Sequence, residues 1–212
     1  MSRTDRTERS ERADRSDRLS ADSAIAAEVK ALILAGDRDA ARERFSALVA
    51  SQQRRAVRLA YQYLRDVHDA DEAVQDAFLK VFTHMTAYRE DLPFEVWFTR
   101  ILVNACLDLR KARSRRLRWV LPIERPRASE LKRPEVADRD RTTEEKLVAA
   151  ARIKEIAAAV DQLPERQRTV FLLSHFGEQT TSQVSAALGL SEATVRVHLF
   201  RAARKLRRLL ER

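Results

Sequence analysis

Apolar residues recur at helical spacing along most of the chain, and gaps in that spacing divide it. Residues 1–20 hold almost no apolar position, whereas the pattern from residue 22 onward predicts helices over 22–35, over 37–50 continuing to 65, and over 69–87 and 93–114. Pro93 suits a first helical turn, because the amide hydrogen that proline lacks would be unpaired there. The spacing resumes at Leu147 and continues to the C-terminus. Two helical domains are therefore expected.

The segment between these domains is polar and rich in proline. Residues 117–143 carry Pro122, Pro126 and Pro134 among charged residues, which predicts an extended linker. We expect a charged disordered tail over 1–20, a first domain over 21–116, this flexible linker, and a second domain over 144–212. With only 3 Gly and 5 Pro in 212 residues, the predicted fold class is all-α.

The charged tail has a regular pattern of its own. Arginine stands at every third position from Arg3 to Arg18, and each arginine after the first directly follows an acid. Such a segment cannot form a core, which favours disorder, although acids four positions before an arginine also support a helix. A solvated tail and a contact to DNA or another protein both remain open interpretations.

The balance of charge indicates the class of partner. The chain has 41 Lys plus Arg against 32 Asp plus Glu, and its net charge of +9 points to nucleic acid, an acidic protein or a membrane surface. No apolar stretch is long enough to span a membrane and no signal-peptide core follows the arginines, so we expect a soluble cytoplasmic protein without a membrane partner.

Few residues are available for catalysis or metal binding. The single Cys106 lies among apolar residues, where a buried thiol is expected rather than a reactive one. With 4 His and no glycine-rich phosphate loop, the sequence predicts no catalytic residue, no metal and no cofactor, so an enzyme acting on nucleic acid is a weak alternative.

The last two predicted helices form a helix-turn-helix pattern. Thr180 and Gln183 have the spacing of a capping box, Gly189 suits the end of that short helix, and Ser191 suits the start of the next. On the last helix one stripe is apolar and is expected to be buried: Val195, Leu199, Ala202, Leu206 and Leu210. The opposite face is basic.

That basic face has the side chains that a major groove accepts. We expect the residues in the first turns of this helix to reach bases: Glu192, Ala193, Arg196, Val197 and Phe200. Val197 or Phe200 would touch a thymine methyl. Arg201, Arg204 and Arg208 are expected to hold phosphates. The alternative is an ordinary amphipathic helix with a solvated arginine face. His198 is expected to lie at the edge of this surface rather than to bind metal, since no second ligand is suitably spaced.

The first domain has two further candidate surfaces. On the helix over 69–87, the outward positions combine acids with apolar residues: Glu72, Gln75, Asp76, Leu79, Phe82 and Thr83. Exposed Leu79 and Phe82 would mark a protein-binding surface, and the alternative is that neighbouring helices cover both residues. Between residues 105 and 120, six cations stand against one acid, Asp108, a composition that suits a DNA backbone or a solvated face. Trp97 is expected in the core.

The helix-turn-helix residues resemble a known family. The runs Leu163-Pro164-Glu165-Arg166-Gln167-Arg168 and Leu188-Gly189-Leu190-Ser191-Glu192-Ala193-Thr194-Val195-Arg196 resemble the sigma-factor domain that reads the promoter −35 element, and resemble LuxR-type regulators as well. The runs 69–78 and 94–104 are similar to the sigma segments that dock polymerase and open DNA, and they favour the extracytoplasmic-function (ECF) sigma factors. Val197, His198 and Phe200 depart from the common family residues and leave the promoter sequence open.

This resemblance implies a function and its site residues. The chain would bind RNA polymerase core through a coiled coil of the clamp, contacted by Glu72, Gln75, Asp76, Leu79 and Phe82. Asn104 and the loop over 84–92 would hold a base flipped from the −10 strand, with Arg100, Arg110 and Arg113 assisting along the DNA. It would initiate transcription without catalysing a reaction, under control of an anti-sigma protein. A LuxR-type regulator, which acts without replacing a sigma factor, is the alternative, although the expected sensor domain is missing.

Overall fold

The computed structural model describes residues 3–119 and 143–211. Within those ranges every regular element is a helix, which confirms the all-α fold class. The described residues belong to two compact units, one within Met1–Glu124 and one within Arg125–Arg212. Most of the expected linker, residues 120–142, lies outside the described residues. No helix in the described part of the chain is long and apolar enough to cross a membrane.

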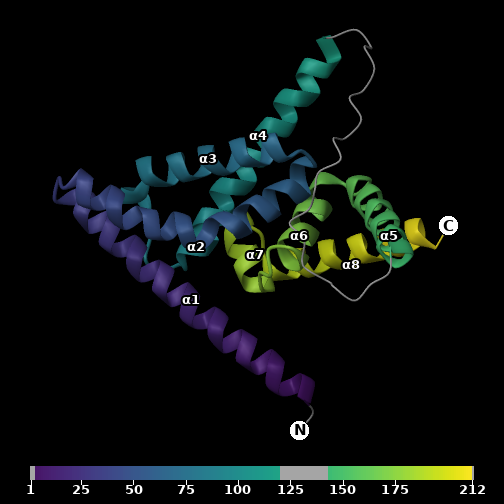
Figure 1. Cartoon of the computed structure of the whole chain (residues 1–212), viewed down its shortest axis with the longest axis horizontal. Coiled ribbons are helices and arrows are strands. Elements are labelled where there is room, and N and C mark those ends of the chain that lie inside the picture. Colours follow the sequence, from purple (N-terminus) through teal and green to yellow (C-terminus); the bar gives the residue numbers. More distant parts are fainter. Residues whose placement is uncertain (1–2, 120–142, 212) are drawn as a thin grey trace. The chain divides into compact units, whose positions relative to one another are not determined.

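The first unit is a bundle of four helices with one short turn (Figure 1). Its elements are α1 (Arg3–Leu34), α2 (Arg38–Leu64), α3 (Val67–Thr83), the 3-10 turn η1 (Met85–Ala87) and α4 (Phe94–Trp119). Helix α2 packs against all three others. Aromatic rings fill the space between α2, α3 and α4: Phe78 packs edge-on against Phe45, with 6.2 Å between ring centroids, and stacks on Phe98 at 4.8 Å. Stacked and edge-on rings contribute beyond their burial, so this cluster fixes how the three helices meet.

Helix α1 begins earlier than the sequence predicts. A disordered tail was expected over residues 1–20, but the helix runs from Arg3 and extends past the rest of its bundle (Figure 1). Nothing before Gly36 interrupts it, since the first 35 residues contain neither glycine nor proline. The acid-to-arginine spacing of four also favours a helix. Asp22, which is buried, accepts hydrogen bonds from Ser51 and Gln52 of α2 and so fixes α1 against it.

The segment after α3 also differs from the sequence prediction. One helix was expected over 69–87, but α3 ends at Thr83 and η1 follows as a separate turn. The amide of Tyr88 donates to the carbonyl of Met85, whose side chain is fully buried. Burying Met85 and Tyr88 together therefore turns the chain away from the axis of α3.

Helical spacing over residues 69–87 predicts one buried apolar stripe, opposite the outward residues. All six of its members are buried: Ala70, Val74, Ala77, Phe78, Val81 and Met85. Cys106 is buried as expected, and burial raises the pKa of its thiol to about 12. Trp97 is half-buried, with its ring 5.3 Å from that of Tyr88.

In the described residues, the second unit consists of four helices. They are α5 (Thr143–Asp161), α6 (Glu165–His175), α7 (Thr181–Leu188) and α8 (Glu192–Leu210). Helix α8 packs against the other three, and Val195, Ala202 and Leu206 of the predicted stripe are buried there, with Leu199 and Leu210 half-buried. Lys205 donates from Nζ to the carbonyl of Gln162 at 2.6 Å and joins α8 to the end of α5.

Candidate nucleic-acid interface

The turn between α7 and α8 is fixed by local hydrogen bonds. Thr180 and Gln183 form a reciprocal capping box, with Thr180 N to Gln183 Oε1 at 3.0 Å and Gln183 N to Thr180 Oγ1 at 3.2 Å. Gly189 ends α7 in the left-handed region at φ +65°, where a side chain would be strained. Ser191 then accepts the amide hydrogen of Thr194 at 3.1 Å and starts α8. These bonds set the angle at which α8 leaves the turn.

The face of α8 that points away from its unit combines apolar and basic side chains. Val197 is 45% exposed and Phe200 is 69% exposed, and Ala193 lies on the same face one turn earlier. The three arginines expected at phosphates, Arg201, Arg204 and Arg208, are all exposed. An exposed apolar row among cations is unusual on a solvated helix. It suits the major groove of DNA, where thymine methyl groups lie between the phosphates of the two strands.

Two of the expected base-reading residues bind each other. Arg196 donates from Nη2 to Glu192 Oε2 at 2.7 Å, one turn apart at the start of α8. The pair holds the guanidinium over the first turn of the helix, the part that enters deepest in a helix-turn-helix complex. His198 is half-buried, and its Nδ1 atom is buried without a hydrogen-bond partner.

Helix α4 presents a polar stripe in the first unit. Arg100 and Asn104 are exposed one turn apart, and the stripe continues through Asp108, Lys111 and Arg115. The other two residues assigned to −10 DNA lie differently. Arg110 is half-buried, and Arg113 forms an ion pair of 2.8 Å with Asp69 at the start of α3. Contact of Arg113 with a phosphate would compete with this ion pair.

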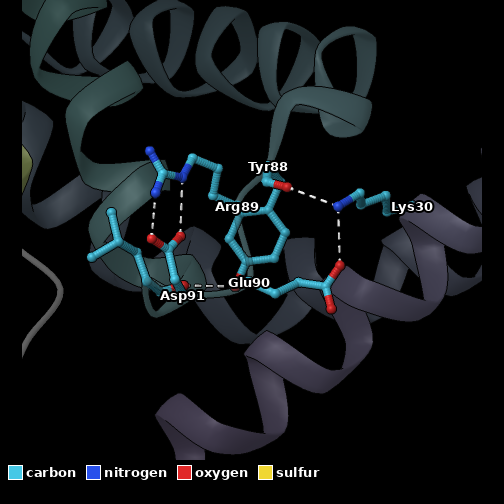
Figure 2. A network of polar contacts seen from close by, with 6 residues as sticks. Lys30, Tyr88, Arg89, Glu90 and Asp91 are labelled. Atoms are coloured by element: carbon cyan, nitrogen blue, oxygen red, sulfur yellow. Dashed lines mark hydrogen bonds and ion pairs between the residues drawn. The ribbon is translucent and has the colours of Figure 1, made fainter.

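The loop between η1 and α4 is closed by its own side chains (Figure 2). The ring of Tyr88 is buried against Phe94 and Trp97, and its hydroxyl donates to the carbonyl of Leu92 at 2.9 Å. Burial raises the pKa of the Tyr88 hydroxyl above its ordinary value. Since Arg100 and Asn104 follow Trp97 by one and two helical turns, the loop and these side chains share one side of α4.

Helix α3 carries the candidate protein-binding face. Leu79 is 72% exposed and Glu72 and Gln75 are exposed with it, whereas Asp76 pairs with Lys80 at 2.6 Å. Phe82, which the sequence assigned to the same surface, is half-buried and lies 5.2 Å from the ring of Phe45. A neighbouring helix thus covers part of Phe82, and Leu79 is the main apolar group on this face.

Sequence reasoning missed the residues of α1 that reach the loop. Lys30 binds the loop from α1 (Figure 2). Ser23 Oγ, also on α1, accepts the amide hydrogen of Phe94 at 3.1 Å. The partners lie 58 to 71 positions apart in the chain, so no local spacing could indicate them. In the described residues, no three His, Cys, Asp or Glu side chains gather as a metal site.

The chain matches two family models and many characterised relatives. Residues 48–116 match the model described as Sigma-70 region 2, and residues 153–206 match that described as Sigma-70, region 4. The ECF RNA polymerase sigma factor SigM of Mycobacterium tuberculosis is 32% identical over 188 residues, which is 87% of this chain and 84% of the relative.

Solved structures share the fold. CnrH, solved in complex with the cytosolic domain of CnrY, superposes with a TM-score of 0.61 at 23% identity, covering 90% of this chain and 97% of the other. RpoE from Bartonella quintana, solved with the anti-sigma factor NepR, gives a TM-score of 0.60 at 18% identity, covering 79% of this chain and 96% of the other.

Proposed function

The chain belongs to the extracytoplasmic-function group of the sigma-70 family, and we propose that it performs the task of that family through three separate surfaces. It is an alternative sigma factor: it binds RNA polymerase core, recognises −35 and −10 promoter elements and initiates transcription. Members of this family are not enzymes, since the polymerase supplies the chemistry. The observation that carries the proposal is that one chain holds both family regions in order, each packed as its own unit with a functional face left exposed.

We assign reading of the −35 element to the exposed face of α8. The groove-facing residues are those of its first turns, Glu192, Ala193, Arg196, Val197 and Phe200. The exposed arginines Arg201, Arg204 and Arg208 bind phosphates, which supply affinity and register but no sequence preference. The apolar row over Val197 and Phe200 favours a promoter with thymine methyl groups at the facing positions.

We assign the −10 element to α4 and the loop beside it. Arg100 and Asn104 are exposed on the side of α4 that carries the loop, which supports a role for their donors and acceptors in holding a flipped base. Capture of an extruded base replaces its stacking in the duplex by contacts in a protein pocket. Arg110 and Arg113 act along the backbone, and Arg113 exchanges Asp69 for phosphate.

We assign polymerase core to the outward face of α3. Leu79 provides the apolar anchor, Glu72, Gln75 and Asp76 provide the polar rim, and Phe82 contributes its uncovered edge. An apolar centre framed by polar groups is the usual organisation of a protein interface. The partner that fits is the coiled coil of the polymerase clamp.

An anti-sigma protein is the proposed regulator. The matched structures of CnrH and RpoE hold CnrY and NepR, respectively, and the second is named as an anti-sigma factor. A partner that covers Leu79 or the face of α8 would block core or promoter binding. Affinity capture of the full chain from its native cells should recover one such protein, and its addition should stop transcription in a purified system.

Run-off transcription with polymerase core tests the main proposal. Core plus this chain, on a library of promoters from the source genome, should give transcripts with defined starts that neither component gives alone. A LuxR-type regulator would bind duplex DNA tightly and yield no such transcript. That result would overturn the sigma assignment, which the region 2 match over 48–116 supports against the regulator.

A further inference from the structure

The loop of residues 88–92 is held in shape from two sides by its own residues. Inside, Tyr88 is almost fully buried, and its hydroxyl bond to the Leu92 carbonyl closes the loop. Outside, Arg89 binds Asp91 through two contacts, of 3.2 Å from Nε and 2.6 Å from Nη2, and both side chains are exposed (Figure 2). The tip therefore presents a paired cation and anion at the surface.

Helix α1 supplies a third point of attachment. Lys30 Nζ donates to the backbone carbonyl of Tyr88 at 3.1 Å and pairs with Glu90 Oε1 at 3.0 Å, so one ammonium group holds the residues on both sides of Arg89 (Figure 2). Its side chain is only 23% exposed, and Glu90 is more exposed than Lys30. A partly shielded ammonium with two acceptors is better ordered than an ordinary surface lysine.

The contact is part of a continuous seam between α1 and the loop. Ser23 lies two turns before Lys30 on the same face of α1 and accepts the first free amide hydrogen of α4 from Phe94. The completely buried Ala26 and Val29 lie between them and pack this part of α1 into the bundle. Both ends of the loop are thus fixed to one rigid helix.

We propose that Lys30 is a positioning residue for −10 recognition, and that α1 is thereby part of the base-reading apparatus. The inference rests on the proposed function, because the loop matters only if it holds a flipped base. Lys30 does not touch the base; it sets the backbone on either side of Arg89 and so the presentation of the Arg89–Asp91 pair. Residue 30 lies outside the segment that matches the region 2 model, residues 48–116.

Lys30 acts by preorganising the loop. A free loop residue loses conformational entropy when it is fixed, so a loop that is ordered only on DNA binding would capture every base more weakly. It would also discriminate less, because a pocket that can adjust accepts a wrong base more readily. Loss of the Lys30 contacts should therefore reduce promoter opening and flatten the preference for the captured base.

The test uses holoenzyme assembled from polymerase core and the full chain. Lys30→Met keeps the aliphatic stem and removes the charge, whereas Lys30→Arg keeps the positive charge and several N–H donors. Arg42→Met is the matched control, because it breaks an exposed ion pair of α2 with Asp39. Each variant is measured on promoters that differ only in the captured −10 base. Permanganate reactivity of unpaired thymines reports opening, and thermal unfolding of the free chain reports the fold.

The wild type should prefer one base on the order of tenfold, the scale of a single base-pair mismatch. Lys30→Met should reduce that preference severalfold and lower opening, Lys30→Arg should restore both, and Arg42→Met should change neither. Glu90→Gln, which leaves the bond of Lys30 to the Tyr88 carbonyl in place, should give a smaller effect and serves if Lys30→Met unfolds. Unchanged base preference in folded Lys30→Met and Glu90→Gln would overturn the proposal. Failure of wild-type holoenzyme to open any promoter would instead refute the proposed function.

Discussion

Substitution of Leu79 by aspartate is the sharpest test of the polymerase surface. Leu79 is 72% exposed in the free chain, so most of its side chain is available for burial in a complex. Complete burial of a leucine is worth about 1.5–3 kcal/mol, so Leu79→Ala should cost roughly 1–2 kcal/mol of binding, or about 5- to 30-fold in Kd. Leu79→Asp adds the desolvation of a carboxylate, several kcal/mol more, and should abolish complex formation at micromolar concentrations.

The same change should leave the fold intact. An exposed side chain contributes little to packing, and surface substitutions usually change the free energy of unfolding by about 0.5 kcal/mol or less. Aspartate near the C-terminal end of α3 opposes the helix dipole and adds roughly 0.3–1 kcal/mol of destabilisation. Circular dichroism and the thermal midpoint should therefore stay close to wild type while binding is lost.

The assay is titration of fluorescently labelled chain with polymerase core, measured by anisotropy. Leu34→Asp is the control, since Leu34 is 68% exposed near the C-terminal end of α1 and receives the same charge at a similar exposure. Wild type and Leu34→Asp should bind alike. Binding of Leu79→Asp at wild-type affinity would refute the assignment, and equal loss in both variants would show that the carboxylate acts through general charge rather than at α3.

Four further outcomes are expected. Arg204→Glu should weaken promoter binding with little change of sequence preference and lower the slope of log Kd against log salt by about one, measured by filter binding at several salt concentrations; an unchanged slope removes Arg204 from the phosphate contacts. Replacing a −35 thymine with uracil removes one methyl group and should cost about fourfold in affinity at a position read by Val197 or Phe200, with no such loss when the reading residue is alanine. Because the pKa of Cys106 is about 12 when folded and lower when unfolded, the unfolded state releases its proton first: stability should fall above about pH 8.5, by up to ~1.4 kcal/mol per pH unit, and urea unfolding of Cys106→Ala should lack that part of the slope. Gly189→Ala should destabilise the second unit by about 1–2 kcal/mol and Gly189→Asn by less, because an added Cβ meets no neighbour within 4 Å and only the positive φ opposes it; equal effects in urea unfolding would contradict this.

Features set by neighbours in the chain were predicted well from sequence. The capping box of Thr180 and Gln183, the left-handed Gly189 and the serine cap at Ser191 each depend on residues within three positions. The buried stripes on α3 and α8 follow from helical periodicity alone. The helix boundaries and the buried face of the helix-turn-helix could therefore be predicted from the sequence alone.

Features set by other helices were not predictable in this way. Phe82 has the spacing of an outward residue, yet Phe45 of α2 lies against it, and only the packing angle of the two helices decides that. The sequence around Lys30 does not indicate its contacts, because both of its acceptors lie about 60 positions away on a loop. Hydrophobic spacing does not indicate the early start of α1, because residues 1–20 hold almost no apolar position and only the lack of glycine and proline favours a helix there.

The ion pair between Glu192 and Arg196 bears on how the protein searches a genome. Non-promoter sequence outnumbers promoters by many orders of magnitude in a genome. Lysine and arginine side chains without an acidic partner bind DNA of any sequence through its phosphates. Glu192 engages one of these cations at 2.7 Å before DNA arrives. At a DNA site without a good acceptor for Arg196, breaking the ion pair with Glu192 is not compensated by new hydrogen bonds. At a site with a well-placed guanine, two hydrogen bonds from Arg196 to the base replace the ion pair. Under the proposed −35 assignment, the carboxylate thus shortens residence on the wrong sequence more than on the right one, and speeds the search by weakening non-specific binding.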